Sequence, residues 1–236
     1  MLEEALKEIG IEPSDLTVSR LRKYYEMVIE KNKVMNLTAI TDEKEFIYKH
    51  FVDSLSLLTV PGICDRGGSI RMIDVGTGAG FPGLVLKIAR PEIDMTLFDS
   101  LQKRLSFLDE IIKELDLSGV CTLHGRAEDL GHDKKHRGAY DIVTARAVAN
   151  LSTLSEYCLP LVKKGGVFAA YKSAGAADEL KAAGSAIAVL GGKAADIREF
   201  TLPGTDYQRA LVFIEKVKDT PAKYPRKAGT PAKEPL

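Results

Sequence analysis

A cluster of alternating glycines follows one short apolar run of the chain. Gly76, Gly78 and Gly80 come directly after Asp74 and Val75, which end that run. Glycines at this spacing let the backbone turn sharply and let a ligand approach main-chain atoms that a Cβ would screen. In open α/β sheets, ligands bind at the carboxyl ends of the strands. The loop therefore predicts a ligand site at the end of the first strand of such a sheet.

Two classes of ligand fit this loop. Gly78, Gly80 and Gly83 satisfy the G-x-G-x-x-G pattern of dinucleotide-binding folds, which is a weak signal on its own. Gly76, Gly78 and Gly80 give instead the G-x-G-x-G pattern of methyltransferases that use S-adenosylmethionine. The Asp74 carboxylate favours the second class, because it would attract a positively charged ligand and repel a pyrophosphate. A P-loop is excluded, because no Gly-Lys-Ser/Thr sequence follows.

A second carboxylate, Asp99, ends the next predicted strand. It could accept hydrogen bonds from ribose hydroxyls, which both cofactor classes carry, or cap the helix that follows. One carboxylate could also do both.

Short apolar runs alternate with amphipathic helices around these residues. Strands are predicted at 70–75, 95–98, 120–123, 141–145 and 166–171, and helices at 84–89, 101–115, 151–159 and 176–190, with a helical turn near Ala127. Such crossovers imply a parallel sheet with both faces covered. Two further strands, 194–201 and 210–217, are joined too closely for a helical crossover, so the last strand should run antiparallel. The predicted fold class is α/β: a Rossmann-like, mostly parallel sheet with a final antiparallel strand, as in methyltransferases.

The N-terminal part reads differently, because its apolar residues have helical spacing over 16–32 and 42–58. The segment 61–68 holds a proline and three glycines and marks a boundary. We expect an N-terminal helical segment (1–62), an S-adenosylmethionine-binding domain (63–218) and a basic, proline-rich tail (219–236).

Composition excludes several classes of protein. The 236 residues are 45% hydrophobic, and 33 basic residues balance 33 acidic ones, which argues against a disordered or polycationic chain. No apolar run could span a bilayer, and no signal-peptide pattern is present. The three cysteines form no CxxC pair, and His132 and His136 lie in a polar loop. We therefore expect a cytoplasmic monomer with no membrane partner and no metal.

Six motifs together carry a family resemblance. They are Asn-Leu-Thr at 36–38, His-Phe-Val-Asp-Ser-Leu at 50–55, the glycine loop at 74–83, Asp-Ser-Leu-Gln-Lys-Arg at 99–104, Arg-Ala-Glu at 126–128 and Tyr-Pro-Arg-Lys-Ala-Gly-Thr-Pro at 224–231. In this order they resemble the bacterial 16S rRNA (guanine-N7) methyltransferases, the glucose-inhibited division protein B family, over nearly the whole chain. The resemblance implies transfer of a methyl group from S-adenosylmethionine to N7 of one guanine in the 530 loop of 16S rRNA, in the small ribosomal subunit.

The resemblance also implies roles for individual residues. Gly76 and Phe81 would contact the cofactor, Ala127 and Glu128 would frame its adenine, and Arg146 would lie at its reactive end. From residue type alone, Glu128 could instead be an exposed carboxylate in the first turn of a helix, and Arg146 could form a surface ion pair. The expected cofactor-binding set is Asp74, Gly76, Gly78, Gly80, Phe81, Asp99, Ala127, Glu128 and Arg146, with Arg146 also expected to be catalytic.

The acceptor chemistry is consistent with this set. The loop 144–148 lacks the Asn/Asp-Pro-Pro-aromatic sequence usual for methylation of exocyclic amines. Carbon-5 methylation needs a thiolate, whereas Cys121 and Cys158 lie inside predicted elements, where structural thiols are expected. Guanine N7 has an available lone pair and needs no base, and an arginine such as Arg146 can reach guanine O6.

The tail offers a way to hold RNA. Its basic residues exceed its acidic ones, and Tyr224 could stack on a base. The basic residues counted from position 216 are Lys216, Lys218, Lys223, Arg226, Lys227 and Lys233. Lys163, Lys164 and Lys172 could extend this patch. Removing residues 219–236 is expected to weaken RNA binding and leave cofactor binding intact, unless the tail only covers the sheet.

Three other functions fit parts of the pattern. The neutral charge would suit a methyltransferase of a small molecule, and the dinucleotide pattern would suit an NAD-dependent oxidoreductase. A non-catalytic RNA-binding module on the same fold would bind RNA without turnover. Cofactor titration and a methyl-transfer assay separate these alternatives.

Overall fold

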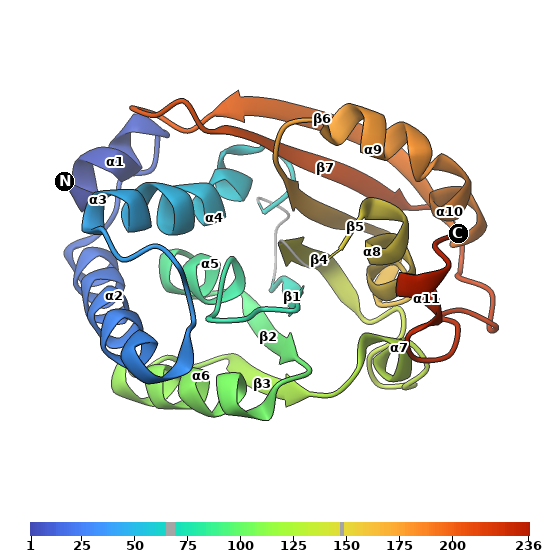
Figure 1. Ribbon diagram of the computed structural model, residues 1–236, viewed down its shortest axis with the longest axis horizontal. Coiled ribbons are helices and arrows are strands. Elements are labelled where there is room, and N and C mark those ends of the chain that lie inside the picture. The colour runs from blue at the N-terminus through green and yellow to red at the C-terminus, as the bar shows by residue number, and fades with distance from the viewer. Residues whose placement is uncertain (65–68, 147–148) are drawn as a thin grey trace.

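A seven-stranded sheet forms the centre of the computed structural model, which describes residues 1–64, 69–146 and 149–236 (Figure 1). The strand order is β3-β2-β1-β4-β5-β7-β6, and β7 runs antiparallel to both of its neighbours. The strands are β1 (Arg71–Val75), β2 (Asp94–Asp99), β3 (Val120–His124), β4 (Tyr140–Arg146), β5 (Val162–Lys172), β6 (Gly192–Thr201) and β7 (Gln208–Lys216). The mostly parallel sheet and its antiparallel strand confirm the predicted fold class.

Helices cover both faces of this sheet, as the near-continuous apolar strands require. Along β1, Met72 contributes to one hydrophobic cluster, whereas Ile73 and Val75 contribute to the other, because successive side chains of a strand point to opposite faces. The helices of the sheet domain are α5 (Gly83–Ala89), α6 (Gln102–Glu114), α7 (Ala127–Leu130), α8 (Leu151–Cys158), α9 (Ala176–Ala182) and α10 (Gly184–Val189).

The N-terminal helices pack on the same face as α5 and α6. They are α1 (Leu2–Glu8), α2 (Asp15–Met35), α3 (Glu43–Phe46), the π-helical turn η1 (Ile47–Val52), α4 (Asp53–Leu55) and the 3-10 turn η2 (Ser56–Thr59). Buried Tyr24, Phe46 and Phe51 belong to the same hydrophobic cluster as Leu84 and Leu97 of the sheet domain. The N-terminal helices and the sheet therefore share one core.

Three predicted elements differ in detail from the structure. The helix predicted at 42–58 is a continuous series of short turns with a π-helical centre. The helix predicted at 176–190 is interrupted at Ala183, just before Gly184, which is a poor helix former. The predicted strand 166–171 begins earlier, at Val162, and its pairing with β4 has a register shift. The last four residues of the predicted boundary, 65–68, lie outside the described residues.

The C-terminal segment, residues 219–236, folds back over α7 and α8 and ends in α11 (Thr230–Lys233) (Figure 1). Tyr224 and Pro231 are buried there. Arg137 donates to the backbone oxygens of Thr220, Pro221 and Tyr224. These backbone contacts give this short proline-rich segment a defined place against the domain.

Candidate active site

The glycine loop leaves β1 and returns into α5 through a series of left-handed turns. Gly76, Gly78 and Gly80 have φ values of 73°, 60° and 103°, which side chains with a Cβ rarely adopt. The N–H groups of Gly76 and Thr77 both donate to the backbone oxygen of Phe98, at 2.8 and 3.0 Å. The loop is therefore pinned to the end of the neighbouring strand β2.

Two buried carboxylates, Asp74 and Asp99, support the loop. Asp74 is fully buried; its Oδ2 accepts from Gly83 N at 3.0 Å and its Oδ1 accepts from Thr144 Oγ1 at 2.9 Å. Burial raises the pKa of Asp74, and these hydrogen bonds oppose the rise. Asp74 ties the loop to α5 and β4, and it lies behind the loop rather than in the lining of the adjacent cleft.

Asp99 joins the glycine loop to the segment that leads into α6. Its Oδ1 accepts from Leu101 N at the start of α6, and its Oδ2 accepts from Gly78 N, each at 2.9 Å. Arg104 lies 3.5 Å from the same carboxylate. Asp99 also lines the adjacent cleft, so the carboxylate that shapes the loop faces that space.

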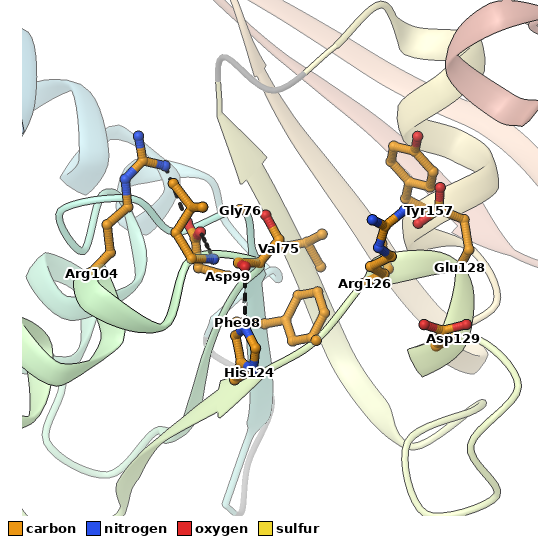
Figure 2. A pocket seen from close by; sticks show the side chains of 14 residues that line it. Val75, Gly76, Phe98, Asp99, Arg104, His124, Arg126, Glu128, Asp129 and Tyr157 are labelled. Atoms are coloured by element: carbon orange, nitrogen blue, oxygen red, sulfur yellow. Dashed lines mark hydrogen bonds and ion pairs between the residues drawn. The ribbon is translucent and has the colours of Figure 1, made fainter. Parts of the chain in front are cut away.

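This cleft has a volume of about 800 Å³ and opens at the carboxyl ends of β1, β2 and β3 (Figure 2). Four of the nine predicted cofactor residues line it: Gly76, Asp99, Ala127 and Glu128. Sequence reasoning missed its other polar members, among them His124, Arg126 and Tyr157, which Figure 2 shows around the same space. Arg126 belongs to the Arg-Ala-Glu motif at 126–128, whereas His124 at the end of β3 and Tyr157 on α8 carry no motif signal.

Glu128 is not the exposed first-turn carboxylate that its position alone allowed. It is 8% exposed, and its Oε1 accepts from Gly229 N at 2.8 Å. Tyr157 lies next to it on the same wall of the cleft (Figure 2). The partner of Glu128 therefore comes from the far end of the chain.

Arg146 lies at the end of β4 in a second pocket, of about 530 Å³. Its guanidinium donates to Asp53 Oδ2 at 2.8 Å, to the Lys49 oxygen at 3.2 Å and to His50 Nδ1 at 3.2 Å. The predicted ion pair thus exists, but with a buried acid from the N-terminal helices. Ala147 and Val148, which complete this loop, lie outside the described residues.

Phe81 connects the glycine loop to this second pocket. Its ring stacks on His50 at a centroid distance of 4.4 Å, and the Arg146 guanidinium lies 5.2 Å from its centroid. Phe81 is 6% exposed and packs also against Tyr24. Phe81 therefore brings a residue of the glycine loop into contact with Arg146 and His50.

His50 is held as a neutral imidazole. Arginine can only donate, so His50 Nδ1 accepts from Arg146 and Nε2–H donates to Thr38 Oγ1 at 2.9 Å. Burial, together with the positive charges of Arg146 and Lys49, lowers the pKa of His50 to about 3. His50 therefore carries no charge at neutral pH, and both ring nitrogens are already engaged.

Asp53 balances two arginines. Its Oδ1 lies 3.3 Å from Arg209 Nε, and its Oδ2 is the Arg146 partner. Burial raises the pKa of Asp53, and the two guanidiniums beside it oppose that rise. Asp53 therefore holds both arginines at the same pocket.

Other predicted features are placed as follows. His132 donates to the Pro225 oxygen, and His136 bonds to Tyr140, so the two rings have separate partners. The described residues contain no group of three or more His, Cys, Asp or Glu suited to a metal ion. In the part of the chain that the structure describes, no helix could cross a membrane.

Three residues of the predicted RNA-binding patch are not available for the contacts expected of them. Tyr224 is buried at 7% exposure, so its ring cannot stack on a base. Lys216 is buried and donates to Thr220 Oγ1, and Arg226 forms a bidentate pair with buried Glu156. The basic residues of this region that are exposed are Lys218, Lys223, Lys227 and Lys233.

The strand order, the antiparallel β7 and the glycine loop after β1 define the fold of class I methyltransferases. A solved 16S rRNA (adenine(1408)-N(1))-methyltransferase from Catenulisporales acidiphilia is similar, with a TM-score of 0.54, 14% identity, and coverage of 64% of this chain and 89% of that one. The YcgJ protein from Bacillus subtilis gives a TM-score of 0.52, 15% identity, and coverage of 70% and 98%. At these identities the likeness concerns the fold.

Sequence comparisons identify the family. The family described as GidB, rRNA small subunit methyltransferase G, matches residues 17–212. The protein named ribosomal RNA small subunit methyltransferase G from an Exiguobacterium species is 50% identical over 99% of this chain and 97% of its own length. The protein of the same name from Alkaliphilus metalliredigens is 48% identical over 100% and 98%. The chain belongs to the rRNA small subunit methyltransferase G family, as its motifs predict.

Proposed function

We propose that this protein transfers a methyl group from S-adenosylmethionine to N7 of a single guanine in the 530 loop of 16S rRNA. The observation that carries the proposal is a pair of pockets at the ends of adjacent strands. One follows β1 and has the carboxylates suited to an adenosyl group; the other, at the end of β4, holds a fixed arginine. Family membership supports the reaction class and the rRNA substrate.

The larger cleft suits the adenosyl part of the cofactor. The Asp99 carboxylate can accept from ribose hydroxyls, and Glu128 can accept from the adenine amino group. Gly76 lets the backbone approach the ligand closely. The cofactor would not contact Gly78, Gly80 and Asp74 directly. These residues shape the loop and hold it against β2 and α5.

The pocket around Arg146 suits the target guanine and its flanking phosphates. Cationic side chains of Lys49, Arg146, Lys172 and Arg209 line it with the carboxylates of Asp53 and Glu179. Arg146 uses three of its five N–H donors on protein partners. The remaining donors can reach guanine O6, next to the N7 that would accept the methyl group.

The reaction is an in-line displacement at a sulfonium. The N7 lone pair attacks the methyl carbon as the carbon–sulfur bond breaks, leaving S-adenosylhomocysteine and a positively charged N7-methylguanine. No proton leaves N7 before attack, so a neutral His50 with both nitrogens engaged is compatible with the chemistry. Alignment of the reactants and exclusion of water can supply much of the rate.

The unit that we propose is a cytoplasmic monomer. The described residues of one chain supply both pockets, the fixed arginine and the supporting carboxylates. Its RNA partner is 16S rRNA within the small ribosomal subunit.

The test is transfer of labelled methyl from S-adenosylmethionine to 16S rRNA, free or within small subunits from cells lacking the protein. Label at one guanine of the 530 loop, mapped by cleavage at N7-methylguanine, is the expected result. Tight cofactor binding without label on either RNA would contradict the proposal and favour a small-molecule acceptor. If Arg146→Ala kept full turnover and full cofactor affinity, the role of Arg146 would be wrong.

A further inference from the structure

The C-terminal segment makes contacts that a solvated tail would not need. Gly131 leaves room for the Pro225 ring, because a Cβ at Gly131 would come closer than 3.0 Å to that ring. His132 donates to the Pro225 oxygen at 2.7 Å, and Thr153 donates to the Pro231 oxygen at 2.9 Å. These contacts seat the segment on α7 and α8, the two helices that form one wall of the larger cleft.

Two further contacts of the segment involve carboxylates of α7 and α8. Gly229 N–H donates to Glu128 Oε1 on α7 at 2.8 Å. Arg226 donates from Nε and Nη2 to the Glu156 carboxylate on α8, at 2.7 to 3.1 Å. Glu156 is fully buried and immediately precedes Tyr157, which lines the cleft beside Glu128 (Figure 2).

The hydrogen bond from Gly229 restricts the side chain of Glu128. A glutamate side chain has several rotatable bonds, and holding it in one rotamer to meet a ligand costs conformational entropy. The backbone N–H of Gly229 holds one carboxylate oxygen before the ligand arrives, so less of that cost falls on binding. The bidentate Arg226–Glu156 pair keeps the segment, and with it Gly229, at the required place.

We propose that the C-terminal segment is a positioning element for the adenine end of the cofactor site, acting through Gly229 on Glu128 and anchored by Arg226 on Glu156. This inference rests on the proposed function, because it takes the larger cleft to be the S-adenosylmethionine site. It reverses the expectation from sequence that removal of residues 219–236 leaves cofactor binding intact. Arg226 and Gly229 are positioning residues, since they act on the ligand through Glu128.

The test compares ligands with and without the group that Glu128 would accept from. Calorimetry measures the Kd of S-adenosylhomocysteine and of its 6-deamino analogue, which has a hydrogen in place of the adenine amino group and no donor at N1. Arg226→Ala is the main variant, and a chain ending at Ala228 removes Gly229 but keeps the Arg226–Glu156 pair. Arg198→Ala is the matched control, because it removes an arginine from an ion pair with Asp196 on the edge strand β6.

We expect both tail variants to bind S-adenosylhomocysteine about tenfold more weakly, because the cost of ordering the Glu128 side chain then falls on binding. Their affinity for the 6-deamino analogue should be unchanged, and Arg198→Ala should match the parent protein for both ligands. With RNA, the variants should show a raised KM for S-adenosylmethionine and an unchanged kcat at saturation.

Three outcomes would overturn this inference: equal loss of affinity for the two ligands, unchanged affinity for both, or a rise confined to the KM for RNA. If Arg226→Ala fails to fold, the chain ending at Ala228 carries the same comparison. Failure of the proposed function would look different: the unmodified protein would then bind neither ligand, or it would bind S-adenosylhomocysteine tightly and leave 16S rRNA unlabelled in the methyl-transfer assay.

Discussion

Two glycines of the loop after β1 should respond very differently to the same substitution. Gly78 and Gly80 both have positive φ, at 60° and 103°, and they are separated by one residue. A Cβ on Gly78 has only the Gly76 oxygen nearby, at 4.0 Å. A Cβ on Gly80 would come closer than 3.0 Å to Tyr24 Oη and lie 3.0 Å from Leu108 Cδ2. Gly80→Ala should therefore destabilise the fold much more than Gly78→Ala.

The size of the difference follows from these contacts. Alanine in a left-handed conformation costs about 1–2 kcal/mol, and this applies at both sites. Gly80→Ala adds overpacking against the N-terminal helix α2 and against α6, which typically costs about 1–3 kcal/mol more. We expect the free energy of unfolding to fall by about 1–2 kcal/mol for Gly78→Ala, and by about 2–5 kcal/mol for Gly80→Ala.

Urea unfolding of the two variants measures this difference, and Tyr24→Phe tests its cause. Tyr24 Oη donates to the Ala79 oxygen at 2.5 Å, so Tyr24→Phe alone should cost about 1 kcal/mol. In the Gly80→Ala background the same change removes the clashing atom, and we expect it to be neutral or stabilising. The coupling energy of this double-mutant cycle should be about 1 kcal/mol or more.

The reasoning would be refuted if the two alanine variants lost the same free energy of unfolding. It would also be refuted if Tyr24→Phe cost as much in the Gly80→Ala background as it does in the parent protein. Either result would mean that contact between α2 and the loop does not constrain Gly80.

Three further predictions concern the Arg146 pocket and the C-terminal segment. His50 has a pKa of about 3 in the folded protein and 6.5 when unfolded, so its neutral form stabilises the fold fully above pH 6.5 and less as the pH falls towards 3. Between pH 7 and pH 5 the free energy of unfolding should fall by about 2 kcal/mol through this residue. Urea unfolding of His50→Asn should show no such contribution. Arg146→Lys keeps a positive charge beside Asp53 but loses the planar guanidinium and its paired N–H donors. We expect kcat to fall about 10- to 100-fold while the thermal midpoint changes little. An unchanged kcat would contradict the proposed contact with guanine. Gly131→Ala places a Cβ against the Pro225 ring, so it should raise the Kd for S-adenosylhomocysteine as Arg226→Ala does. An unchanged Kd by calorimetry would mean that displacing the C-terminal segment does not affect the cleft.

Local patterns were sufficient to predict most of the sheet. Continuous apolar runs identify strands buried on both faces, and glycines after β1 mark a backbone that must turn with positive φ. The short connection between β6 and β7 predicted the antiparallel strand, which the structure confirms. Each of these signals lies within about a dozen residues, where the spacing of residue types carries the information.

The partners of the site residues could not be predicted in this way. Arg146 pairs with Asp53, 93 positions away, and Glu128 pairs with Gly229, 101 positions away. Neither pairing has a sequence period, because each depends on how the N-terminal helices and the C-terminal segment cover the sheet edge. The composition of the C-terminal segment predicted a basic tail that holds RNA, since prolines and lysines give no hydrophobic period. Its place in the structure is set by backbone carbonyls that Arg137 binds.

The two ends of the chain therefore contribute contacts at opposite sides of one edge of the sheet. The N-terminal helices and α11 lie on opposite sides of the sheet domain (Figure 1), and each brings a charged or polar group to a residue at the end of a parallel strand. Burying Arg146 without Asp53, or Glu128 without its N–H partner, would leave a charge uncompensated in a partly dry environment. The parallel sheet alone would therefore hold the glycine loop in place but would leave the side chains of Arg146 and Glu128 unfixed. The groups that fix these two side chains come from outside the sheet.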